Sequence, residues 1–163
     1  MKRGLIVILS LILFTTAASA KSRLKIGEPI PEFTLKDLKG FELRVPEQLK
    51  GRVFIIHFWA DWCTYCLEEM PALDRIYRRY KRKGLEIIAI NVGQKEERVN
   101  AFLKNVKVSY RVLLDRDMKV AKTFNVLGLP RTFFIDRRGR LRFRILGDAT
   151  EATLERLVKK IIR

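Results

Sequence analysis

The sequence is poor in metal-binding side chains. Among its 163 residues there are only two cysteines, Cys63 and Cys66, and a single histidine, His57. A structural zinc site needs four ligands, so a Cys pair requires a second pair of Cys or His ligands. That second pair is missing, and His57 lies inside an apolar run. A structural zinc site is therefore excluded, and redox chemistry is the leading interpretation of the cysteine pair.

Long apolar segments are missing as well. The apolar run at residues 5–14 is shorter than the roughly 20 residues that span a bilayer. With the basic residues before it and the Ala-x-Ala ending at Ala20, it is typical of a secretory signal peptide. We expect residues 1–20 to be removed and residues 21–163 to form one domain, with an uncleaved anchor as the alternative. Both predict an exported protein in the periplasm or at the outer face of the cytoplasmic membrane, where disulfides persist.

Acidic residues are few compared with basic ones. The chain has 34 Lys and Arg against 18 Asp and Glu, a formal net charge of +16. Such an excess attracts nucleic acid, anionic lipid or acidic partners. The basic residues are spread over predicted helix faces and one strand, so a solvated basic surface is the preferred interpretation. We do not expect nucleic-acid binding. We do expect weak association with an anionic membrane surface, which would bring the domain near a membrane-bound redox partner.

Hydrophobic periodicity places the secondary structure. Residues 53–59 form a nearly continuous apolar run, which is typical of a strand covered on both faces. Two short alternating runs, residues 33–36 and 41–44, predict a hairpin. Other strands are expected at residues 85–92, 110–114, 131–136 and 140–146, and helices at 67–82, 95–104, after Asp115 and after Thr150. Strands that alternate with helices and end in a hairpin and a helix predict an α/β sandwich with a mixed sheet.

The cysteine pair lies between the central strand and the first predicted helix. That helix has acidic residues near its start and basic residues in its last turn, which complements the helix macrodipole. At a helix N-terminus or in a Cys-x-x-Cys motif, a cysteine pKa falls from about 8.5 to between about 3.5 and 7.5. Because the thiolate is the species that attacks disulfides, we predict Cys63 as the nucleophile. Cys66, one turn further into the helix, is predicted to be the shielded resolving thiol.

In order and spacing, these motifs resemble the thioredoxin superfamily, specifically the exported TlpA/ResA-like thiol-disulfide oxidoreductases. The resemblance covers residues 26–163 and rests on residues 27–35, 50–53, 58–71, 84–92 and 128–139. It implies a thioredoxin-like three-layer sandwich with a central mixed β-sheet, an N-terminal β-hairpin and an added helix after the second core strand. It also implies that the Cys63–Cys66 disulfide is the redox group, with no other cofactor and no metal.

The resemblance implies further site residues. Pro130 takes the place of the family's cis-proline, although only about 5–6% of X–Pro bonds in folded proteins are cis. The backbone at Leu129 and Pro130 is then available to pair with a substrate peptide. Trp62 matches a residue that covers the sulfur of the first cysteine. Glu69 matches an acidic residue that assists proton transfer, and its alternative interpretation is a helix-dipole carboxylate on a solvated face.

Two positions depart from the family pattern. His57 stands where thioredoxin has a buried aspartate and the exported relatives often have asparagine. A lone histidine on an apolar strand is usually a hydrogen-bonded core residue; the alternative is a neutral base that accepts the proton of Cys66. Tyr65 replaces the proline that usually precedes the second cysteine, so the reduction potential is left open between about −270 and about −120 mV.

We therefore expect an exported thiol-disulfide oxidoreductase that reduces disulfides in exported proteins. By family analogy, apocytochrome c before haem attachment is a substrate and a membrane thiol-electron transporter is the reductant. A thiol-dependent peroxidase is one alternative, since the hairpin region also resembles peroxiredoxins, but residues 59–62 lack the Thr and Pro that precede a peroxidatic cysteine. A copper- or haem-delivery chaperone is another, because thiols are soft metal ligands.

Overall fold

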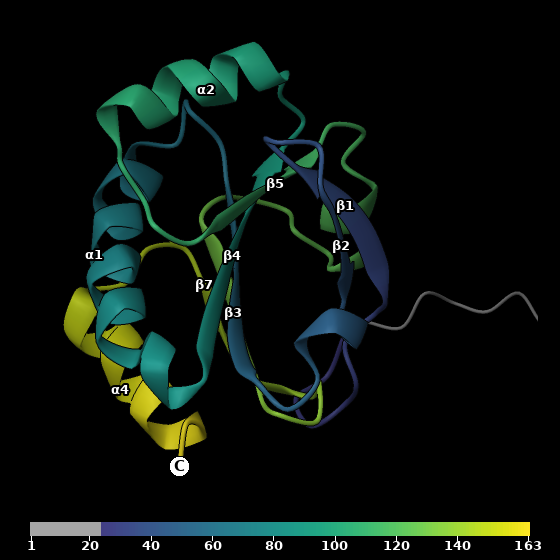
Figure 1. The fold of residues 1–163 in the computed structure, drawn as a ribbon, viewed down its shortest axis with the longest axis vertical. Coiled ribbons are helices and arrows are strands. Elements are labelled where there is room, and N and C mark those ends of the chain that lie inside the picture. The colour runs from purple at the N-terminus through teal and green to yellow at the C-terminus, as the bar shows by residue number, and fades with distance from the viewer. Residues whose placement is uncertain (1–23) are drawn as a thin grey trace, which may run out of the picture.

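A single mixed sheet organises the part of the chain that the computed structural model describes, residues 24–163. The predicted signal peptide lies outside these residues. The sheet has seven strands in the order β2-β1-β5-β4-β3-β6-β7 (Figure 1). The strands are β1 (Phe33–Asp37), β2 (Glu42–Val45), β3 (Val53–Trp59), β4 (Leu85–Val92), β5 (Arg111–Asp115), β6 (Arg131–Ile135) and β7 (Leu141–Leu146). The strands β3, β4 and β5 are parallel, and the remaining pairings are antiparallel, which confirms the predicted mixed sheet.

Helices cover both faces of this sheet. They are α1 (Thr64–Tyr80), α2 (Glu96–Asn105), α3 (Lys119–Thr123) and α4 (Glu151–Ile161), with short 3-10 turns η1 (Glu47–Leu49) and η2 (Lys81–Lys83). Figure 1 shows α1 and α4 together on one face, with α2 above them at one end of the molecule. Residues of α3 pack into the apolar layer on the other face. The three layers and the added helix after β4 agree with the predicted fold. Within residues 24–163, no helix has both the length and the apolar character required to cross a bilayer.

The central strand β3 divides the core into two apolar layers. All its residues are buried, and alternate side chains of a strand point to opposite faces. Val53, Ile55 and Trp59 pack in the layer beneath α1 and α4. Phe54, Ile56 and Phe58 pack in the other layer, where Phe58 contacts Phe124 and Phe133. By this alternation His57 belongs to the layer beneath α1.

Two predicted helix ends are confirmed, and one detail is corrected. Gly84, with φ +91°, closes η2 in the left-handed region that favours glycine. Thr150 caps α4 by accepting the Thr153 N–H. The helix α1, however, begins at Thr64 rather than Leu67, so its first turn holds no acidic residue. Glu69 accordingly lies further into the helix, and it is buried.

Candidate active site

Cys63 and Cys66 form a disulfide where β3 ends and α1 begins. Cys63 is the N-cap of α1, with extended backbone, and its carbonyl accepts the Cys66 N–H at 3.0 Å. Cys63 is 4% exposed and Cys66 is fully buried. The positive end of the helix dipole therefore lies at Cys63. This arrangement supports Cys63 as the attacking thiolate and Cys66 as the shielded partner.

The loop before β6 approaches the same end of β3. The strand register pairs Phe58 with Arg131, so Pro130 comes level with the last residue of β3. The Leu129–Pro130 peptide bond is cis, as the resemblance implied. Pro130 is buried, and its carbonyl accepts the Gly147 N–H at 3.1 Å. A second cis bond, Val45–Pro46, was not predicted.

Apolar side chains are exposed around the cysteine pair. Trp62 and Tyr65, which flank Cys63 in the sequence, are 67% and 57% exposed, and Leu127, in the loop before Pro130, is 84% exposed. Large apolar side chains that cluster at the surface are typical of interaction sites rather than of a monomer's ordinary surface. Leu129, in the same loop as Leu127, is partly buried.

A buried polar cluster lies one helical turn beyond Cys66. It joins His57 on β3, Thr132 on β6 and Glu69 on α1, none more than 2% exposed. The Thr132 hydroxyl donates to Glu69 Oε1 at 3.0 Å and lies 2.9 Å from His57 Nδ1. His57 Nδ1 is itself 3.6 Å from Glu69 Oε1. The solvated-face interpretation of Glu69 is therefore wrong, and the three side chains form one hydrogen-bonded unit.

The burial of this unit changes the proton affinity of both titratable members. Burial disfavours charge, so it lowers the pKa of His57 from 6.5 to about 3. Burial also raises the pKa of Glu69 from 4.5 to about 7, helped by the nearby Asp148 carboxylate and opposed by hydrogen bonding to Thr132 and the Ala149 backbone. A neutral His57 thus faces a carboxyl group that gains and loses its proton near neutral pH.

The Thr132 hydroxyl links the two titratable side chains by hydrogen bonds. When Glu69 is ionised, this hydroxyl donates to it, and the hydroxyl oxygen can accept from His57 in the ring tautomer that carries its proton on Nδ1. The other ring nitrogen, Nε2, is buried and makes no hydrogen bond to the described residues. In that tautomer, Nε2 is an unprotonated base with an available lone pair.

Thr132 was not identified from the sequence. It lies directly opposite His57 in the antiparallel β3–β6 ladder, so the pairing depends on a strand register that periodicity alone does not specify. A hydroxyl two residues after the predicted cis-proline was the only available signal.

A second network, also missed from the sequence, holds the loop that leads into Cys63. The Asp61 carboxylate accepts from Gln94 Nε2 at 2.5 Å and from Arg98 Nε at 2.8 Å. Gln94 Oε1 in turn accepts the Asp61 N–H at 2.9 Å and the Asn91 amide at 2.8 Å. Desolvation acts to raise the pKa of Asp61, but the hydrogen bonds from Gln94 and Arg98 outweigh it and keep this pKa below its ordinary value.

An aromatic contact joins the same two segments. Trp59, the last residue of β3, packs on Phe102 of α2 with ring centroids 4.7 Å apart. The added helix α2 is thus fastened to the end of β3 by an aromatic pair and to the following loop by Arg98. Its position gives this helix a role in fixing the cysteine loop.

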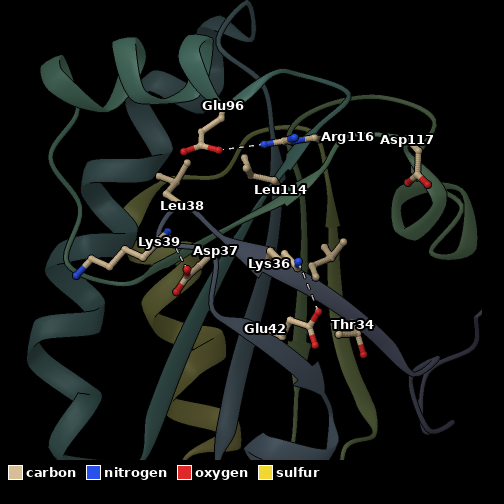
Figure 2. A pocket seen from close by; sticks show the side chains of 12 residues that line it. Thr34, Lys36, Asp37, Leu38, Lys39, Glu42, Glu96, Leu114, Arg116 and Asp117 are labelled. Carbon is tan, nitrogen blue, oxygen red and sulfur yellow. Dashed lines mark hydrogen bonds and ion pairs between the residues drawn. The ribbon is translucent and has the colours of Figure 1, made fainter.

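A surface cavity lies away from the predicted site residues. It has a volume of about 660 Å³ and is formed by the β1–β2 hairpin, the start of α2 and the end of β5. Figure 2 shows two pairs of oppositely charged side chains in it: Glu96 pairs with Arg116 at 3.0 Å, and Lys36 pairs with Glu42 at 3.9 Å. Asp37 is occupied by the backbone N–H groups of the hairpin turn. None of the predicted site residues lines this cavity, and its charges are largely compensated.

Metal ligands do not gather in the part of the chain that the structure describes. Residues 24–163 contain no group of three or more His, Cys, Asp or Glu side chains arranged to hold a metal ion. The two sulfurs are joined to each other, and the buried His57 and Glu69 are bound to Thr132.

Comparisons with known proteins agree with this geometry. Residues 26–144 match the model of the AhpC/TSA family. The chain is 34% identical over 160 residues to thiol-disulfide oxidoreductase ResA of Geobacillus kaustophilus, covering 96% of this chain and 91% of that protein. It is 32% identical over 150 residues to the protein of the same name from Bacillus subtilis, covering 92% and 83%.

Solved structures extend the likeness to the fold. A crystal structure from Chlorobium tepidum assigned as a thiol:disulfide interchange protein DsbE superposes with a TM-score of 0.81 at 27% identity, covering 86% of this chain and 99% of that one. The thioredoxin domain of a thiol-disulfide oxidoreductase from Bacteroides vulgatus superposes with a TM-score of 0.77 at 25% identity, covering 86% and 99%.

Proposed function

Because the chain belongs to the AhpC/TSA family and to the ResA-like thiol-disulfide oxidoreductases of the thioredoxin superfamily, we propose that it reduces disulfides in exported proteins. The single observation that carries the proposal is the position of the Cys63–Cys66 disulfide at the N-terminus of α1. That position stabilises the thiolate needed for attack, and the exposed side chains around it offer a surface for a protein substrate.

The first half of the reaction forms a mixed disulfide. The Cys63 thiolate attacks one sulfur of the substrate disulfide, the substrate S–S bond breaks, and one substrate sulfur leaves as a thiolate that takes a proton from water. Trp62 and the backbone at Leu129 and Pro130 hold the extended substrate segment beside Cys63. An extended segment can pair its backbone with that of the loop.

The second half releases the substrate. Cys66 loses its proton and attacks the Cys63 sulfur, so that the mixed disulfide breaks and the Cys63–Cys66 bond forms. Two electrons have then passed from the cysteine pair to the substrate. Cys66 is fully buried, so its proton leaves inside the protein, and Glu69 of the buried unit lies one helical turn further along α1.

We assign this proton to the buried unit. His57 Nε2 accepts it while Nδ1 passes its own proton to Thr132, whose hydroxyl proton moves to Glu69 Oε1. The ring changes tautomer and never carries a charge, which fits the low pKa of His57. Glu69, with a pKa of about 7, holds the proton until it is released to solvent.

Partners follow from the same chemistry. The oxidised cysteine pair must be reduced again by an external dithiol, and a membrane thiol-electron transporter is the proposed source. Apocytochrome c is a proposed substrate. Two of the curated relatives are named ResA, and the ResA-like family is the one from which we expected this role. Both assignments require an exported domain, as the N-terminal sequence predicts.

A trapping experiment tests the proposal. A Cys66→Ser variant retains the nucleophile but cannot resolve the mixed disulfide, so it should accumulate covalent complexes with exported proteins that separate on reduction. The matched control is Cys63→Ser, which keeps one thiol but should trap little. Equal trapping by both variants, or release of the captured proteins without a reductant, would contradict the proposed roles.

A thiol-dependent peroxidase remains the second candidate, since the AhpC/TSA match covers most of the domain. The residues before Cys63, from Trp59 to Trp62, lack the Thr and Pro of a peroxidatic site. Peroxide consumption by the reduced protein separates the two functions. If the protein is a reductase, it should consume peroxide no faster than an ordinary thiol does. Rapid turnover with peroxide would show that it is a peroxidase instead.

A further inference from the structure

Basic side chains gather at the end of the molecule opposite the cysteines. The turn between β6 and β7 and the C-terminal part of α4 line two adjoining hollows of about 350 and 410 Å³, which share Lys160 and Arg163. We call their basic residues the basic pole: Arg137, Arg138, Arg140, Arg142, Arg156, Lys159, Lys160 and Arg163. Figure 1 shows the C-terminal end of α4 at the end of the molecule opposite α2.

The strand register sets the distance between the two ends. Ile135, just before the β6–β7 turn, pairs with Phe54 at the start of β3, and Arg137 O accepts the Gly51 N–H at 3.1 Å. The cysteines follow the other end of this seven-residue strand. At about 3.3 Å per residue, the basic pole lies roughly 20 Å from the start of the cysteine loop.

Carboxylates compensate only a small part of this charge. The two hollows contain two acidic residues. Asp136 pairs with Arg142 at 3.3 Å, and Glu155 pairs with Lys159 at 3.4 Å and with Arg79, outside the pole, at 2.8 Å. Within residues 24–163, none of the ion pairs involves Arg137, Arg138, Arg140, Arg156, Lys160 or Arg163.

Backbone contacts hold two of these arginines in place without neutralising them. Arg137 donates to the carbonyls of Gly51 at 2.9 Å and Ile162 at 3.3 Å, and Arg140 donates to that of Gly27 at 2.9 Å. These bonds join the turn to the C-terminal end of α4 and to the segment before β1. The charges are therefore presented on a fixed surface formed by three separate segments.

Simpler explanations account for part of the pole only. Lys159 and Lys160 lie in the last turn of α4, where cations complement the macrodipole. Arg142 lies on the edge strand β7, where charge prevents pairing with another sheet. Neither reason applies to Arg138 in the turn, nor to the meeting of both groups at one surface.

We propose that the basic pole binds the surface of a bilayer that contains anionic phospholipid. Arginines line both hollows, and guanidinium groups bind phosphate well. Single-stranded nucleic acid, in contrast, is bound on exposed aromatic platforms. The one aromatic side chain that lines the two hollows, Phe143, is half-buried, with Lys160 Nζ 5.9 Å from its ring centroid.

In the docked orientation the cysteine pair points away from the bilayer, toward soluble proteins. Electrostatic attachment is reversible, so the domain also turns to meet a membrane-bound reductant.

The test compares two triple variants of the full chain that lose the same charge. Arg138→Ser, Lys160→Ser and Arg163→Ser remove unpaired charges of the basic pole. The control removes three exposed lysines without ion pairs elsewhere: Lys39→Ser, Lys104→Ser and Lys107→Ser. Binding is measured by co-sedimentation with vesicles of phosphatidylcholine containing 30 mol% phosphatidylglycerol and with vesicles of phosphatidylcholine alone. Residues 1–20, which include Lys2 and Arg3, are shared by all variants, so the difference between the two triple variants reports the basic pole.

Near an anionic membrane each Lys or Arg contributes about 1 kcal/mol, or about fivefold in affinity. The first triple variant should therefore bind phosphatidylglycerol vesicles roughly one hundredfold more weakly than the wild type, with binding lost at high salt. The control triple should lose less than about fivefold. Equal losses of affinity in both triple variants, or no preference for phosphatidylglycerol vesicles, would overturn the proposal. So would tighter binding to a single-stranded oligonucleotide that the first triple variant weakens to the same degree.

Discussion

The two ends of the central strand have opposite surface chemistry. At the carboxyl end of β3, a disulfide lies among exposed apolar side chains, the Glu69 carboxyl group is buried, and Asp61 is paired with Arg98. At the amino end, the β6–β7 turn and α4 expose arginines without carboxylate partners. The first end suits short-range chemistry with an apolar peptide, and the second suits long-range attraction to an anionic surface.

The difference shows how one small domain separates recognition from attachment. Electrostatic attraction between exposed charges decays over about 8–10 Å in physiological salt. Across roughly 20 Å of strand, the basic pole should leave the chemistry at the cysteines unaffected. The buried unit, in contrast, lies within the reacting end, so substitutions there should change both rate and pH dependence.

The largest expected effect comes from the buried unit. Glu69→Gln removes the final proton acceptor, and general acid–base assistance is worth about 10²-fold or more. We expect the resolving step at pH 7 to slow by about 10²-fold and the inflection near pH 7 to disappear, because the pKa of Glu69 is about 7. Stopped-flow measurement of mixed-disulfide resolution from pH 5 to 9 checks both.

Thr132 provides a matched pair of controls. Thr132→Val removes the hydroxyl that joins His57 to Glu69 and should slow resolution by about tenfold, with the inflection displaced to higher pH because a hydrogen bond that stabilises the carboxylate is lost. Thr132→Ser keeps the hydroxyl and should behave like the wild type. If both variants leave the inflection unchanged, Thr132 has only a packing role.

A second prediction concerns the pH dependence of stability, where the two titratable members act in opposite directions. The pKa of Glu69 is raised from 4.5 to about 7 in the folded state, so its contribution is full below pH 4.5 and is lost as pH rises to 7. The pKa of His57 is lowered from 6.5 to about 3, so its contribution is full above pH 6.5 and is lost as pH falls to 3. Between pH 4.5 and 6.5 the folded and unfolded pair each hold one proton, and the two effects cancel.

Single substitutions should expose each half of this balance. In His57→Asn, the free energy of unfolding should fall by on the order of 3 kcal/mol as pH rises from 4.5 to 7, at 1.36 kcal/mol per pKa unit. In Glu69→Gln, it should rise with pH between about 3 and 6.5. Urea denaturation at several pH values checks this against the wild type. Parallel curves for all three proteins would show that the pair does not titrate as described.

The residues that carry these predictions could be only partly anticipated. The nearly continuous apolar run predicted both ends of β3, and helix-terminus chemistry placed Cys63 at the N-terminus of α1. The beginning of α1 was missed by three residues, because Thr64 and Tyr65 do not follow its apolar period. Thr132 required the β3–β6 register, which depends on the whole sheet. Such features arise from tertiary packing, and local sequence patterns contain little information about them.

The basic pole shows the same limit. Its arginines occupy two separate stretches of sequence, which suggested a dispersed basic surface. They meet because Arg137 bonds to Gly51 on one side and to the end of α4 on the other. From the net charge, a solvated basic surface was the preferred interpretation, and only the packing of α4 beside the hairpin brings these residues to one surface.

A third, smaller effect should come from the network that fastens the cysteine loop to α2. Arg98→Ala removes a charged hydrogen bond to Asp61, whose side chain is mostly buried while that of Arg98 is exposed. We expect a loss of stability of about 1 kcal/mol and a three- to tenfold lower rate of substrate attack, since the loop loses order. Arg116→Ala, which breaks an exposed pair beside the distant cavity, is the control and should change neither quantity appreciably.

The smallest effect is expected at the basic pole itself. The Arg138, Lys160 and Arg163 triple variant should reduce a soluble disulfide within about twofold of the wild-type rate and unfold within about 0.5 kcal/mol per substitution, as is typical of exposed residues. Insulin reduction in solution and thermal denaturation provide the measurements. A tenfold loss of rate would mean that the two ends are not independent.

The reduction potential of the Cys63–Cys66 pair tests the central claim most directly. Equilibration with defined thiol–disulfide buffers, followed by alkylation and mass spectrometry, gives the fraction of each form. The account predicts one two-electron transition that involves both cysteines, at about −250 mV or below, near the values of reducing members of the fold. A potential near about −120 mV would make the protein an oxidant and contradict its assignment as a reductase.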